Sequence, residues 1–178
     1  MKCPHCKTPD LKPTMIEEGL PAMGCGTCHG SLVSLLYYRH WAETQNAPSG
    51  EAQDAGADLE TTDTTTAILC PKCDRLMAKY KLTGRVSNRV DVCATCDEAW
   101  LDGGEWQLLE ALQLSLKIPA ISTERCQRRI RHELTEDTRR SILSRLIGED
   151  ATAKVEEFRT WLAKSKHKSQ IMTYLYRA

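Results

Sequence analysis

Four Cys-x-x-Cys pairs dominate the first hundred residues of this chain, and they fall into two sets. Eighteen residues separate the pairs of the first set, and nineteen separate those of the second. Two pairs at this separation can each hold one side of a tetrahedral ion while the residues between them form a β-hairpin. The spacing therefore predicts two zinc ions, each bound by four thiolates: Cys3, Cys6, Cys25 and Cys28 in one site, and Cys70, Cys73, Cys93 and Cys96 in the other.

The second set repeats the first after about 67 residues, which indicates an internal repeat of one small unit. Four cysteine ligands leave no open coordination position, so a structural role is expected for each ion. Iron in a rubredoxin-like site is the alternative, because ligand softness does not exclude it. The ninth cysteine, Cys126, is predicted to be an inert thiol on a buried helix face.

The residues between Cys73 and Cys93 have the alternating pattern of a β-hairpin with Thr83-Gly84 as its turn. Apolar residues occupy one parity between residues 78 and 92 and are expected to pack. The other parity carries four cations that could neutralise phosphates: Lys79, Lys81, Arg85 and Arg89. The alternative is a solvated strand face with no binding role.

After Cys96 the pattern changes to that of a helix. Asp102 is placed to cap it, and Glu105 can return a hydrogen bond to the cap's own amide. Leu101 and Trp106 stand at the positions of a hydrophobic staple. The helix is expected to continue towards Pro119, which should end it.

These residues resemble the TFIIB-type zinc-ribbon family of transcription-factor zinc fingers. The similarity covers about residues 69–112 and is carried by Cys-Pro-Lys-Cys, the second Cys-x-x-Cys, and Trp100, Leu101, Asp102 and Glu105. It implies a zinc-ribbon fold, a bound zinc ion and an association with transcription. The first unit departs from the pattern, since its equivalent residues are Leu32, Val33, Ser34 and Tyr37, and a helix start is not expected there.

The remaining segments complete a small α+β protein. Residues 44–68 carry five acids, no Lys or Arg, and few bulky apolar groups, so they are expected to form a flexible acidic linker. The predicted domains are zinc ribbon 1 (1–43), this linker, zinc ribbon 2 with its following helix (69–118), and a C-terminal helical region (119–178). The last region should contain one helix from Ser122 or Thr123, a second capped at Thr135 and ended by Gly148, and a third capped at Asp150.

The chain carries neither a Ser-His-Asp order, nor a phosphate-binding glycine loop, nor paired catalytic carboxylates, so no enzymatic activity and no small-molecule substrate are expected. The first hypothesis is a zinc-bearing accessory factor that contacts DNA, RNA or RNA polymerase through ribbon 2. The alternative is a protein-binding adaptor that uses its C-terminal helices. No apolar run reaches membrane-spanning length and the start lacks a signal-peptide core, so the expected location is the cytoplasm.

Overall fold

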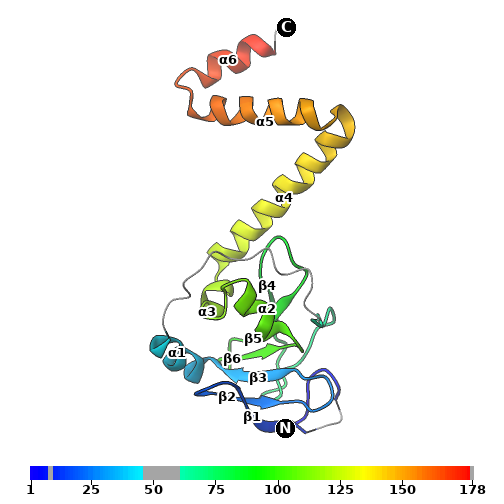
Figure 1. Ribbon diagram of the computed structural model, residues 1–178, viewed down its shortest axis with the longest axis vertical. Coiled ribbons are helices and arrows are strands. Elements are labelled where there is room, and N and C mark those ends of the chain that lie inside the picture. The colour runs from blue at the N-terminus through cyan, green and yellow to red at the C-terminus, as the bar shows by residue number, and fades with distance from the viewer. Residues whose placement is uncertain (8–9, 46–60, 177–178) are drawn as a thin grey trace. The chain divides into compact units, whose positions relative to one another are not determined.

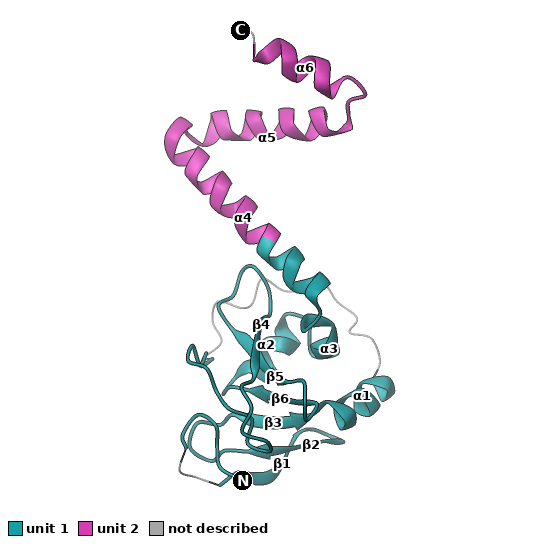
Figure 2. Cartoon of the chain, turned by 180° about the vertical axis from the view of Figure 1, so that it is seen from behind, with its two compact units in different colours: residues 1–131 teal, residues 132–178 magenta. Residues whose placement is uncertain are grey.

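The computed structural model describes residues 1–7, 10–45 and 61–176, and it confirms a mixed α+β fold. The chain divides into two compact units, residues 1–131 and residues 132–178 (Figure 2). Unit 1 holds the strands, both cysteine sets and the first helices. Unit 2 is helical.

Six antiparallel strands form one sheet in unit 1 (Figure 1). The first half of the sheet comes from ribbon 1 and the second half from ribbon 2. The strand order is β1-β2-β3-β6-β5-β4. The strands are β1 (Lys12–Glu17), β2 (Leu20–Gly24), β3 (Ser31–Ser34), β4 (Ala78–Lys81), β5 (Arg89–Cys93) and β6 (Glu98–Leu101).

The two ribbons share this sheet because β3 pairs with β6, whereas the sequence predicts two ribbon domains joined only by a flexible linker. Leu32 stands opposite Trp100, and these two residues occupy equivalent positions in the two repeats. The pairs on the other side of each strand agree with this symmetry. Leu32 stands opposite Met23 of β2, and Trp100 stands opposite Asp91 of β5, which is the residue equivalent to Met23. The repeats are therefore related by a pseudo-twofold axis that passes between Leu32 and Trp100.

Helices α1 (Leu35–Thr44), α2 (Glu105–Ala111) and α3 (Ile118–Ile121) pack with one face of the sheet. This helix-side core includes Val33, Ala99 and Leu101 from the central strands. Alternate residues of a strand point to opposite faces, so Leu32 and Trp100 point to the other side. There they join the buried cysteines of both ribbons in a second cluster, the cysteine-side core.

Helix α1 corrects the expectation that ribbon 1 lacks a following helix. It begins directly after β3 although the side chain of Ser34 makes no cap hydrogen bond. Leu35, Tyr38 and Trp41 lie on one side of the helix and are buried. Burial of this stripe, together with the ring contact between Trp41 and Trp106, replaces the missing cap as the source of stability.

Helix α2 follows the predicted cap only in part. The Glu105 carboxylate accepts a hydrogen bond from the Asp102 amide at 2.9 Å, as predicted. The Asp102 carboxylate instead accepts from the backbone amide of Thr64 and the indole of Trp100. The helix ends at Ala111 rather than continuing to Pro119, which lies in the first turn of α3, where a proline costs no hydrogen bond.

Part of the predicted linker belongs to the folded unit. Residues 46–60 lie outside the described residues, whereas residues 61–68 lie against ribbon 2. The Thr62 amide donates to the Gly103 carbonyl at 2.9 Å, and the Met77 amide donates to the Ile68 carbonyl at 3.0 Å. The Ile68 side chain is buried in the cysteine-side core. The acidic, threonine-rich composition of this segment does not indicate that its backbone forms these hydrogen bonds.

Helices α4 (Glu124–Ile147), α5 (Glu149–Lys164) and α6 (Lys168–Leu175) form the C-terminal region, and α4 begins in unit 1 and ends in unit 2. The prediction that Thr135 caps a new helix is wrong, because α4 runs through it without a break. Glu136 pairs with Arg139 and Arg159 and thereby stabilises an interior helix position. Gly148 does end α4, with φ at +83°, and α5 begins at the next residue, so Asp150 lies in its first turn rather than at its cap.

Candidate metal centres

Each Cys-x-x-Cys pair folds into the same tight turn. The amide of the residue after the second cysteine donates to the carbonyl of the first cysteine at 2.9–3.0 Å. That residue has a positive φ of 56–69° in all four turns, at Lys7, His29, Asp74 and Asp97. A left-handed conformation costs a non-glycine residue about 1–2 kcal/mol. Four such residues at equivalent positions show that all four turns adopt the same strained conformation, a cost that binding of an ion would offset.

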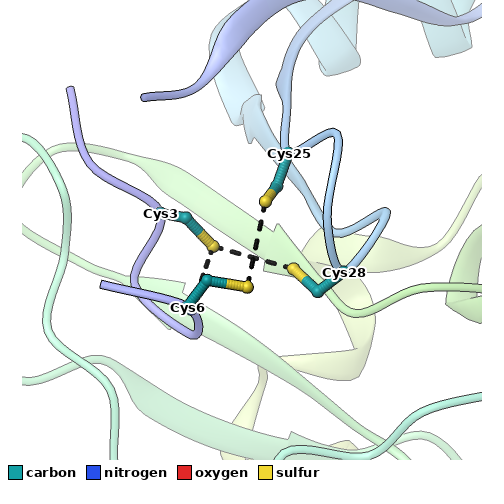
Figure 3. A group of neighbouring side chains, drawn as sticks. All are labelled: Cys3, Cys6, Cys25 and Cys28. Carbon is teal, nitrogen blue, oxygen red and sulfur yellow. Dashed lines mark hydrogen bonds between the residues drawn. The ribbon is translucent and has the colours of Figure 1, made fainter. Parts of the chain in front are cut away.

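The turns bring the eight predicted ligands together as two quartets. In each quartet the four sulfur atoms lie within 4.8 Å of one another. Figure 3 shows the ribbon 1 quartet, in which Cys3 Sγ lies 3.7 Å from Cys28 Sγ and Cys25 Sγ lies 4.0 Å from Cys6 Sγ. In ribbon 2, Cys73 Sγ lies 3.7 Å from Cys93 Sγ.

These separations fit a tetrahedral ion. Zinc–sulfur bonds of about 2.3 Å place the sulfur atoms of a regular tetrahedron roughly 3.8 Å apart. The first cysteine of each pair is buried and the second is partly exposed. Each quartet could therefore hold one metal ion with four thiolates, and no coordination position would remain for substrate or water.

Backbone amides prepare one thiol of each quartet for deprotonation. Burial acts to raise the pKa of Cys25, but hydrogen bonds from the amides of Cys28 and Thr27 outweigh it and lower that pKa to about 7. The pKa of Cys73 is also lowered to about 7, chiefly by the amide of Arg75. Since thiolates are the ligating form, these amides favour deprotonation of Cys25 and Cys73. Burial raises the pKa of Cys3 and Cys70 and so opposes deprotonation of these partners.

The neighbouring histidine and the ninth cysteine stand apart from the quartets. His5 Nδ1 lies 2.7 Å from Thr64 Oγ1, so this side chain links ribbon 1 to the segment 61–68. Cys126 is partly exposed at the start of α4, where its sulfur lies 3.9 Å from Arg129 Nη2. Its predicted burial is therefore only partial.

A cluster of carboxylates that the sequence did not indicate lies beside ribbon 2. Oxygens of Asp63, Asp102 and Glu105 lie within 4.8 Å of one another. Burial raises the pKa of Glu105 to about 8, against opposing hydrogen bonds from the Asp102 amide and Asn88. Asn88 also donates to the Thr62 carbonyl, so the cluster attaches segment 61–64 to ribbon 2.

The cations of the predicted phosphate-binding face are partly neutralised within the fold. Lys79 pairs with Asp91 at 2.7 Å, and the Asp91 side chain is only 1% exposed. Arg89 pairs with Asp63 at 3.1 Å. The backbone of Lys81 bonds to the side chain of Gln127, while Arg85 lies exposed near the hairpin turn. The packed face is confirmed by the burial of Val90 and Val92, but the opposite face is not uniformly cationic.

Comparison with known proteins adds no further assignment. No family model, no curated protein and no solved structure matches this chain. Among the described residues, no helix is both long enough and apolar enough to cross a bilayer.

Proposed function

We propose that this protein is a non-enzymatic adaptor in which two structural zinc ions stabilise a rigid sheet and the C-terminal helices bind a protein partner. The closed cysteine quartets support the structural role, because a catalytic zinc keeps one position open. Sulfur separations of 3.7–4.0 Å support an ion of this size in both ribbons. Zinc is preferred to iron because closed four-cysteine sites of this kind are common for structural zinc.

The observation that carries the adaptor proposal is the exposed apolar surface of unit 2. Among its described residues only Thr152 and Leu162 are buried. Nine large apolar or aromatic side chains are exposed: Ile142, Leu146, Ile147, Val155, Phe158, Trp161, Tyr174, Leu175 and Tyr176. Helix α6 has only 8 residues and would be marginal in water by itself, and helices such as α5 gain most of their stability from tertiary packing. A partner that covers these side chains would supply that packing.

Nucleic-acid binding through ribbon 2 is the second candidate, and it rests on Lys81 and Arg85 beside the hairpin turn. The ion pairs of Lys79 and Arg89 oppose it. A cation whose charge is compensated by a buried or half-buried carboxylate releases fewer counterions when it meets a phosphate. Ribbon 2 is therefore a weaker basis for a function than the helices are.

Metal analysis of the purified protein tests the first part of the proposal. We expect two equivalents of zinc per chain and a colourless solution. A ferric site with four cysteine ligands would instead absorb visible light, and fewer than two equivalents of any metal would contradict the assignment. Exhaustive chelation should unfold unit 1, because the metal supplies about 10–16 kcal/mol per site.

Affinity capture from nuclease-treated cells tests the second part. The variant Ile142→Ser/Leu146→Ser removes two exposed apolar side chains from the second half of α4 and should lose the captured protein. The variant Lys81→Gln/Arg85→Gln leaves the ion pairs of Lys79 and Arg89 intact and should retain it. The reverse pattern, with nucleic-acid affinity that falls steeply with salt and is lost in the second variant, would replace the adaptor proposal with nucleic-acid binding.

A further inference from the structure

Helix α5 has one occupied side and one open side. Its occupied side faces α4, where Arg140 bonds to Glu149 and Glu156 and where Arg159 pairs with Glu136. On this side Thr152 is completely buried. Hydrogen bonds and ion pairs within the chain therefore already satisfy this face of the helix.

The other side of α5 carries an apolar stripe of Val155, Phe158 and Trp161, which remains exposed although the neighbouring Leu162 is buried. Their exposed fractions are 44%, 40% and 53%. The rings of Phe158 and Trp161 contact each other, with centroids 5.5 Å apart. Aromatic side chains provide about 150–250 Å² of buriable surface each, so this stripe offers substantial contact area along the helix.

A row of four exposed charges flanks this stripe. Asp150, Lys154, Glu157 and Lys164 follow one another at helical spacings of four, three and seven residues. Within the part of the chain that the structure describes, none of the four forms an ion pair. The signs along the row are negative, positive, negative and positive.

Val155 and Phe158 of the stripe are complementary to themselves, and so is the row, when a second α5 runs antiparallel to the first. Such an arrangement places Val155 opposite the second copy's Phe158. It also places Asp150 opposite Lys164 and Lys154 opposite Glu157. The midpoint of each pair along the helix lies close to the level of Glu156, so one twofold axis at that level can bring all three pairs together.

We infer that α5 pairs antiparallel with α5 of a second copy of this chain. This inference rests on the proposed function and names the occupant of part of the same helical surface. The dimer would hold two zinc-stabilised sheet units on one helical core and leave Ile142 and Leu146 of α4 for another protein.

The balance of charge favours a second copy over an anionic surface. An anionic membrane or a nucleic acid would be recognised by a row of positive charges, whereas the charges beside the stripe alternate in sign. An isologous interface requires that a surface complement itself, and an alternating row does so only in the antiparallel direction.

Sedimentation velocity of the zinc-loaded full chain tests the inference through a charge exchange. The variant Asp150→Lys/Glu157→Lys makes the row wholly positive, and Lys154→Glu/Lys164→Glu makes it wholly negative. Each variant alone should dimerise about tenfold more weakly than the wild type, because every flanking pair becomes repulsive. An equimolar mixture of the two should recover the dimer as a heterodimer, which mere damage to the helix would not allow.

The control Lys166→Glu/Lys168→Glu makes the same change in net charge as Lys154→Glu/Lys164→Glu, but beyond the end of α5, and should leave dimerisation unchanged. The fluorescence of Trp161 provides a second measurement. Trp41, Trp100 and Trp106 are already buried, so a shift of the tryptophan emission to shorter wavelength would report the burial of Trp161 as the dimer forms. A wild-type chain that stays monomeric, or a mixture that stays as monomeric as its components, overturns the inference. Neither result prevents the full chain from capturing another protein, so failure of the dimer inference can be distinguished from failure of the adaptor proposal.

Discussion

Removing the metal from ribbon 1 should weaken metal binding by ribbon 2, because the two ribbons share a sheet and a core. The perturbation is Cys25→Ser/Cys28→Ser, which destroys the first quartet and leaves the second intact. Trp100 and Leu101 of ribbon 2 are 0% and 1% exposed. They lie in clusters that contain ribbon 1 side chains, among them Leu32 and Val33.

The size of the effect follows from these two side chains. Exposing a buried large apolar side chain costs about 1.5–3 kcal/mol, so losing the ribbon 1 cover costs roughly 3–6 kcal/mol. A tenfold change in affinity corresponds to about 1.4 kcal/mol. The zinc affinity of ribbon 2 should therefore fall by about two to four orders of magnitude, although one equivalent of zinc remains bound because the site itself supplies about 10–16 kcal/mol.

Competition with a chromophoric chelator measures this coupling. Cys126→Ser is the matched control, because it removes a thiol outside both quartets and should leave both affinities unchanged. An unchanged affinity of the ribbon 2 site in the double variant would show that the ribbons are energetically independent and would refute the coupling through Trp100 and Leu101.

Two further predictions concern the interior of unit 1. A Cβ at Gly30 would lie 2.3 Å from the Trp100 side chain, whereas one at Gly26 would meet nothing within 4 Å. Gly30→Ala should therefore lower the free energy of unfolding by about 1–3 kcal/mol. Gly26→Ala is the control, and chemical denaturation should show no such loss for it. Equal midpoints for these two variants would contradict the packing of Trp100 on Gly30. The raised pKa of Glu105 means that its ionised form disfavours the folded state, so the wild type should lose stability relative to Glu105→Gln as pH rises from about 4.5 to about 8. Parallel stability profiles of the two zinc-loaded proteins across that range would show that Glu105 titrates normally.

The two cysteine quartets could be predicted because their signal is local. A Cys-x-x-Cys turn depends on residues adjacent in sequence, and the structure gathers the eight predicted sulfurs into two quartets. The bond from the Asp102 amide to Glu105 is likewise a local interaction across three residues. Zinc as the bound metal, and a partner for the helices, stay predictions.

The sharing of one sheet could not be predicted, because it depends on contacts between distant segments. The repeat shows that two ribbons exist, but the pairing of Leu32 with Trp100 leaves no local pattern. The same limit applies to Asp63, which belongs to an acidic segment by composition yet pairs with Arg89 of the hairpin. The buried ion pair of Lys79 with Asp91 was missed because alternation alone marks a strand face as polar without showing whether it is covered.

The register between β3 and β6 has a consequence for how such a chain can arise and change. A lone ribbon whose third strand paired with its own copy would place identical side chains across the axis, so any large residue there would meet itself. Joining two ribbons in one polypeptide removes that restriction, and here the two positions differ, with tryptophan on one side and leucine on the other. Covalent duplication thus lets one half accept a bulky anchor while the other supplies the space, after which the halves are free to specialise.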